Sequence, residues 1–74
     1  MVREAVHVYV YDNLEDFETS LESTIYDVRK GTFEGVPCEI VDIKYQTAMA
    51  WNPERTEMET AFSALVIYDF EPKE

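Results

Sequence analysis

The chain has few cations, few glycines and a single cysteine, and the first two shortages each exclude a class of protein. Six lysines and arginines are set against sixteen aspartates and glutamates in 74 residues, which gives a formal net charge of −10. Such a chain has no basic surface that could replace the counterions of nucleic-acid phosphates or adhere to an anionic membrane. Two glycines are also too few for a glycine-rich phosphate loop. We therefore expect no direct binding of nucleic acid or membrane.

Residues that carry catalysis or bind metals are equally scarce. Cys38 is alone, so we expect a free thiol and a reducing compartment such as the cytoplasm. His7 is the only histidine, and beside Tyr9 it is more simply interpreted as a partly buried ring than as a catalytic base. No group of cysteines, histidines or acidic residues has the spacing of a zinc or calcium site. We therefore expect a protein that is not an enzyme, with no metal site.

Apolar residues make up 46% of the chain, which is enough for one folded domain over residues 1–74. Alternation predicts strands at about 4–11 and 39–51, and a segment that is apolar on both faces predicts a third strand at about 57–70. A stripe of apolar residues at helical spacing predicts a helix at about 13–30. Asp12 and Glu15 have the spacing of a capping box at its start, and Gly31 is placed to end it. The stripe consists of Leu14, Phe17, Leu21, Ile25 and Val28.

The order of these segments, β-α-β-β, predicts an α+β fold. A strand–helix–strand unit crosses over right-handedly and leaves room between its two parallel strands. The segment 57–70 is apolar on both faces, which favours a central position. We therefore expect a half-ferredoxin-like, three-stranded antiparallel or mixed sheet of order 1-3-2, with one helix on one face. Large side chains remain uncovered on the other face, which indicates a homo-oligomer.

Aromatic residues provide the candidate binding site. Most of them fall on the predicted strands, and they are more than one helix can cover. One interpretation is that they form the core and the subunit interface. The other is that some of them line a pocket between subunits and stack on a flat ligand such as a flavin or a nucleobase. Lysine and arginine could meet a phosphate of such a ligand. Trp51, beside a predicted turn at 52–55, is the favoured stacking residue. The candidate ligand-binding residues are Arg3, His7, Tyr9, Tyr11, Lys44, Tyr45, Trp51 and Arg55.

Three short segments around an acidic helix resemble a known family. The segments VYVYD at 8–12, VDIKY at 41–45 and FSALVIY at 62–68 are similar to the small sporulation-associated protein family of spore-forming bacteria and their phages, over about residues 6–69. This resemblance implies a cytosolic protein without an assigned chemistry. The β-α-β-β order, the length and the aromatic last strand also resemble the dodecin family. That second resemblance implies an oligomer that holds stacked flavins, with Trp51 as the stacking residue.

Two functions stay open on the sequence. The first is a non-enzymatic oligomeric binder that sequesters a flat or nucleotide-like ligand between its subunits, as storage proteins and phage-type signal sponges do. The second is an acidic protein–protein interaction module, or an inhibitor that mimics the charge of DNA and binds a basic protein partner. An enzyme has no residue pattern in its favour.

Overall fold

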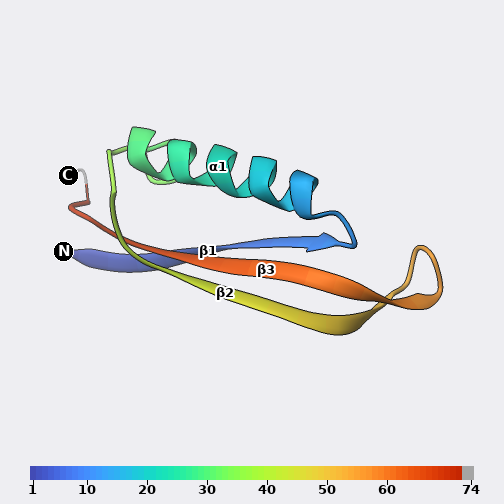
Figure 1. The fold of residues 1–74 in the computed structure, drawn as a ribbon. Coiled ribbons are helices and arrows are strands. Elements are labelled where there is room, and N and C mark those ends of the chain that lie inside the picture. The colour runs from blue at the N-terminus through green and yellow to red at the C-terminus, as the bar shows by residue number, and fades with distance from the viewer. Residues whose placement is uncertain (73–74) are drawn as a thin grey trace.

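A computed structural model describes residues 1–72 of the chain, and their fold confirms the expected element order (Figure 1). The elements are the strand β1, Val2–Tyr11, the helix α1, Leu14–Lys30, and the strands β2, Glu39–Asn52, and β3, Glu57–Phe70. The predicted bounds agree with these to within two residues. The long segments were predictable because each one keeps a single periodicity from end to end.

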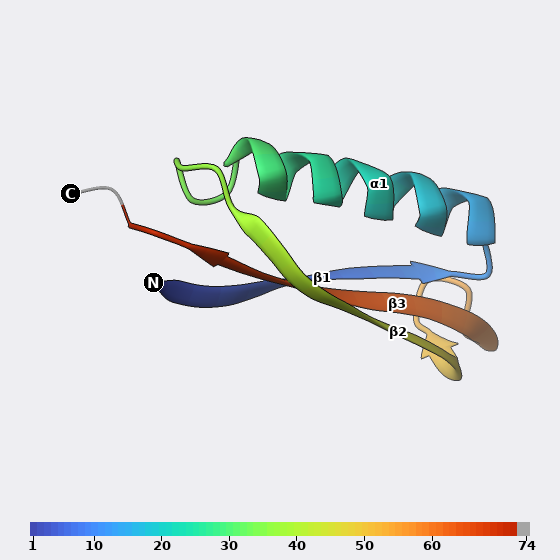
Figure 2. The ribbon, with the colours of Figure 1, turned by 60° about the vertical axis from the view of Figure 1, so that its left-hand side comes forward.

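The three strands form one sheet in the order β1-β3-β2, as expected. β3 pairs antiparallel with both neighbours, so β1 and β2 run parallel without pairing with each other. The helix α1 lies along one side of this sheet, as two views of the ribbon show (Figure 2). We term the side that carries Val8 and Ala64 the helix face and the opposite side the open face.

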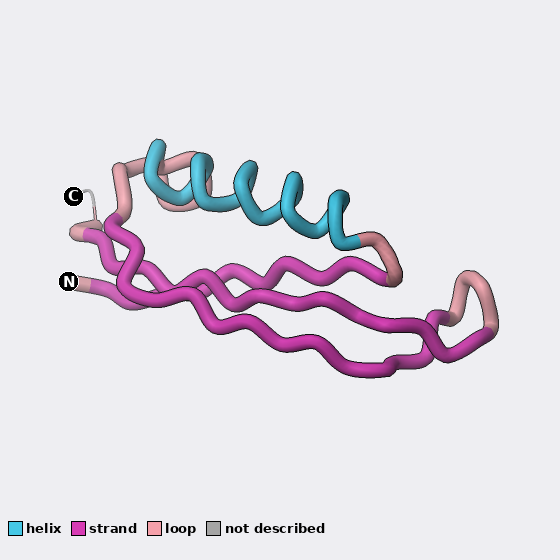
Figure 3. The backbone as a smooth tube through the Cα atoms, viewed as in Figure 1, coloured by secondary structure: helices cyan, strands magenta, loops and turns pink. Residues whose placement is uncertain are grey.

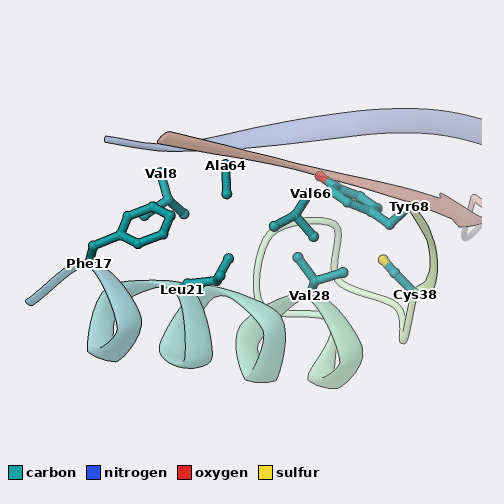
Figure 4. Close-up of a cluster of buried hydrophobic side chains, with 8 residues drawn as sticks. All are labelled: Val8, Phe17, Leu21, Val28, Cys38, Ala64, Val66 and Tyr68. Carbon is teal, nitrogen blue, oxygen red and sulfur yellow. The ribbon is translucent and has the colours of Figure 1, made fainter. Parts of the chain in front are cut away.

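The core lies between α1 and the helix face. Phe17, Leu21 and Val28 project from the helix towards the sheet (Figure 4), as their spacing predicts. Leu14, the first residue of the predicted stripe, is 52% exposed and lies outside this core. The buried cluster consists of Val8, Phe17, Leu21, Val28, Cys38, Ala64, Val66 and Tyr68.

The two ends of α1 are fixed by different residue types. The N-cap is Asn13, whose extended backbone lets its side chain accept a hydrogen bond from the Asp16 N–H. The predicted capping box of Asp12 and Glu15 is therefore wrong, because Asp12 has a φ of 49° and turns the chain one residue before the cap. Gly31 ends the helix in the left-handed conformation, with a φ of 91°, as expected.

A β-bulge changes which residues of β2 face the helix. The pairing of β2 with β3 shifts between Ile40 and Asp42. Alternation alone places Ile40 and Ile43 on opposite faces, yet both pack against the core. The bulge takes up Val41, which is 46% exposed, and restores the helix face for the aliphatic side chains on either side of it.

The hairpin of β2 and β3 is longer than the helix that covers it. The 17 residues of α1 span about 25 Å, whereas the longest extent of the chain is 47 Å. The hairpin end therefore stands clear of the helix (Figure 3). At the opposite end of the sheet Val2 is level with Phe70, so β1 begins where β3 ends.

One core side chain predicts how stability depends on pH. The Tyr68 ring is buried, and its hydroxyl donates to the Glu34 carboxylate at 2.9 Å. Burial, and then this hydrogen bond, raise the pKa of Tyr68 from 10.0 to about 12. The unfolded chain then loses the phenol proton at a lower pH than the folded chain, so stability falls as pH rises from 10 to 12. We expect urea unfolding to show this loss, and Tyr68→Phe to remove the part that belongs to this residue; an equal loss in the variant would contradict the assignment.

Candidate functional site

The eight candidate residues do not form one site. Tyr45 and Trp51 are level with Ala64 and Met58 of β3 and lie on the helix face. His7, Tyr9, Tyr11 and Lys44 lie on the open face, because each is level with an odd-numbered residue of β3 between 61 and 65. Arg3 is at the far end of β1, level with Asp69, and Arg55 is in the turn between β2 and β3.

An exposed apolar surface follows the hairpin on the helix face. Tyr45, Met49 and Trp51 lie on the same face of β2, with Thr47 between the first two, and Trp51 is level with Met58 of β3. Their exposed fractions are 66%, 60% and 54%, and that of Met58 is 54%. The Thr60 hydroxyl donates to the sulfur of Met49 at 3.6 Å. We term Tyr45, Met49, Trp51 and Met58 the hairpin stripe.

Three rings form a ladder along β1 on the open face. His7 and Tyr9 meet edge to face with 5.6 Å between ring centroids, and Tyr9 and Tyr11 do so at 5.2 Å. The Tyr11 hydroxyl donates to the backbone carbonyl of Trp51 at 2.9 Å, past Ala61 of the central strand, which is buried. The adjacent Tyr9 side chain is the main cause of the raised pKa of Tyr11. Tyr11 thus ties β1 to the strand beyond its neighbour.

The depression next to this ladder brings three of the candidates together. It has a volume of about 390 Å³ and is open to solvent. His7 is exposed there, which corrects the expectation of a partly buried ring. His7 and Lys44 are level with Leu65 from opposite sides. The lining residues are His7, Lys44, Tyr45, Gln46, Ser63 and Leu65.

Both candidate arginines already have carboxylate partners. The Arg3 guanidinium donates to both carboxylate oxygens of Asp69, at 2.8 and 2.9 Å. This pairing raises the pKa of Arg3 and lowers the pKa of Asp69. Arg55 lies 3.3 Å from Glu59 and 3.5 Å from Glu57. The geometry that would suit a phosphate is therefore occupied by acidic side chains of the chain itself.

Sequence reasoning missed one buried carboxylate at the hairpin turn. Glu59 stands between Met58 and Thr60, where the pattern of the sequence suggests an exposed strand edge, but it is 7% exposed. Its carboxylate accepts from the side-chain amide of Asn52 at 3.3 Å and meets Arg55, while the Asn52 side-chain oxygen accepts from the Glu54 N–H at 3.0 Å. These contacts fix the turn next to Trp51. They join residues on both sides of the turn, so alternation within one strand gives no signal for them.

In residues 1–72 no group of three or more histidine, cysteine, aspartate or glutamate side chains is arranged to hold a metal ion. No helix in this range is both long and apolar enough to cross a membrane.

Comparison with known proteins gives one match. The family described as sporulation protein Cse60 matches residues 5–70, which confirms the resemblance to sporulation proteins. No curated protein and no solved structure matches the chain. The resemblance to dodecins is not confirmed.

Proposed function

Since the chain belongs to the Cse60 family of sporulation proteins, we propose that it is a non-enzymatic oligomeric binding protein, which holds a flat small ligand between its subunits. The observation that carries this proposal is the hairpin stripe. A row of two aromatic and two methionine side chains is more than half exposed on one face of the hairpin. Catalysis has no comparable arrangement of residues to support it.

The stripe supports binding because of its size and composition. Two aromatic and two methionine side chains at these exposures offer on the order of 500 Å² of apolar surface. A contiguous exposed patch of a few hundred Å² marks an interaction site more often than plain surface. Tryptophan and tyrosine also provide flat faces on which a ring system can stack. Methionine adapts its shape to what it contacts.

A position between subunits is supported by the shape of the single chain. The stripe lies on the helix face of the hairpin, and the turn end of this hairpin extends beyond α1 (Figure 1). A flat ligand stacked on Trp51 would leave its other face in water. Side chains of a second subunit that reach the stripe would cover that face and exclude water from it.

The charges favour a ligand with little negative charge. Arg3 and Arg55 are engaged by carboxylates, and Lys44 lies on the face opposite the stripe. The net charge of −10 repels anions at long range. A neutral ring system such as a flavin or a nucleobase therefore fits the stripe better than a nucleotide whose phosphate carries the binding.

Riboflavin and FMN, which share a ring system but differ by a phosphate, test this proposal. We expect riboflavin fluorescence to be quenched on titration with the protein, and FMN to bind more weakly. Trp51→Leu keeps an apolar side chain but removes the flat face, so riboflavin affinity should fall about tenfold or more. Tyr26→Leu, which removes an exposed ring from α1 and not from the stripe, is the matched control and should bind as the unchanged chain does. Equal affinity in Trp51→Leu would overturn stacking on Trp51, and no riboflavin binding by the unchanged chain would overturn a flavin as the ligand.

A further inference from the structure

We infer that β2 pairs antiparallel with the β2 strand of a second copy of this chain, about a two-fold axis near Ala48. The two sheets then form one continuous sheet with both helices on the same side. This inference rests on the proposed function only in requiring more than one subunit. It names the second copy, the strand and the register, and it needs no ligand.

The first observation is the outer edge of β2. The strand has 14 residues, lies at the edge of the sheet, and is unpaired on its outer side within residues 1–72. Edge strands are ordinarily protected from pairing by charges, proline, bulges or shortness. Between residues 43 and 52 there is no proline and one charged residue, Lys44, in a chain with 30% charged residues. The bulge lies before this segment, at Ile40 and Asp42.

The second observation is the low charge of this segment. A chain of net charge −10 repels its own copies, so self-association needs a surface that is locally neutral. The segment 43–52 carries a charge of +1 from Lys44. A basic protein partner would instead be drawn to the acidic side chains elsewhere. Local neutrality therefore favours a second copy as the occupant of this edge.

The faces of the sheet restrict the register. A two-fold axis perpendicular to the sheet keeps the helix face of both copies on the same side, and only residues on the same face can be level with one another. With the axis at Ala48, Lys44 is level with Asn52 of the second copy, whose neighbour on β3 is Glu57. With the axis at Thr47, Asp42 and not Lys44 is level with Asn52 of the second copy. The carboxylates of Asp42 and Glu57 would then lie near each other. Of these two registers, charge complementarity therefore favours the one centred on Ala48, and symmetry makes the contact twice.

The same register joins the two hairpin stripes. On the helix face Tyr45 is then level with Trp51 of the second copy, and Thr47 with Met49. The exposed side chains of both stripes meet in the space between the two helices. Their apolar area and the paired strand edges together approach the roughly 800 Å² per partner of a standard interface. The two Tyr45–Trp51 pairs also place aromatic faces from both subunits beside one another, where the proposed ligand would be enclosed.

Charge reversal tests the interface without any ligand. We expect sedimentation velocity at micromolar concentration to give the mass of two chains. Lys44→Glu and Glu57→Lys should each raise the dissociation constant about tenfold, because the contact occurs twice. The double variant, Lys44→Glu with Glu57→Lys, should restore it. Lys30→Glu makes the same change in net charge on α1 and should leave the dissociation constant unchanged.

A second variant acts at the axis itself. Ala48 is exposed, so Ala48→Glu leaves the single chain folded but sets two carboxylates level with each other in the dimer. We expect a single chain with an unchanged circular dichroism spectrum. A single chain before any substitution would overturn the inference, and so would a dimer that tolerates Ala48→Glu. A dimer with the expected variant behaviour that binds no riboflavin would leave this inference standing and remove flavin binding from the proposed function.

Discussion

Replacing Gly31 with alanine is expected to destabilise the chain by about 3 kcal/mol or more. The φ of 91° is unfavourable for any residue with a Cβ atom. That Cβ atom would also lie 2.4 Å from the backbone carbon and oxygen of Val36 and 2.8 Å from the nitrogen of Pro37. Backbone atoms cannot move aside as the end of a side chain can, so either α1 or the loop after it must shift. Urea unfolding of Gly31→Ala, followed by circular dichroism, measures the loss.

Gly35 provides the matched control. Its φ is also positive, 76°, but an added Cβ atom would meet nothing within 4 Å. Gly35→Ala should therefore show only the backbone cost, about 1 kcal/mol. Equal losses in the two variants would show that the left-handed conformation, and not the close approach of α1 to the loop, makes Gly31 necessary.

Phe17→Ala should cost about 3–4 kcal/mol. The Phe17 side chain is 6% exposed and its ring lies 5.9 Å from that of Phe62, centroid to centroid. It is the core residue nearest the start of α1, so its removal leaves a cavity between the first turns of the helix and β3. A domain of this length has a total stability of about 4–11 kcal/mol. We expect thermal unfolding to begin about 15–25 °C lower.

Leu14→Ala, one turn earlier on the same helix, is the control for this loss. Leu14 is 52% exposed, so its truncation should cost less than about 1 kcal/mol. A loss from Leu14→Ala as large as that from Phe17→Ala would mean that the helix start is packed differently in solution. The comparison also distinguishes helix propensity from core packing, because both variants place alanine in the first turns of α1.

The fold was predictable where one physical rule acts over a whole segment. β3 is apolar on both faces and has a strand on each side, and this pattern alone indicated its central place. The end of α1 was predictable because Gly31 is where the apolar stripe stops. The identity of the N-cap was not predictable, since Asp12 and Asn13 are both good capping residues and the backbone angles decide between them. The bulge at Ile40 also has no local signal, because the segment alternates acceptably in either register.

The candidate site was predictable only in part. The surplus of aromatic residues indicated exposed rings, and Trp51 and Tyr45 are exposed. They lie on the opposite face of the sheet from Tyr9 and Tyr11. Alternation along a single strand does not predict this, because only the pairing of strands determines which residues of different strands share a face. The partners of Arg3 and Arg55 are Asp69 and Glu59. Arg3 meets its partner through strand pairing across the whole chain, a contact that no short motif contains.

The place of the two strand ends has a mechanical consequence. Val2 and Phe70 are level with each other at one end of the sheet. A force that pulls the two ends of the chain apart therefore acts across the β1–β3 ladder, in line with its hydrogen bonds. Those bonds would be loaded one pair after another, as in a zipper, and not all at once in shear. A chain built this way yields to tension from its ends at a low force, whatever the thermodynamic stability of its core.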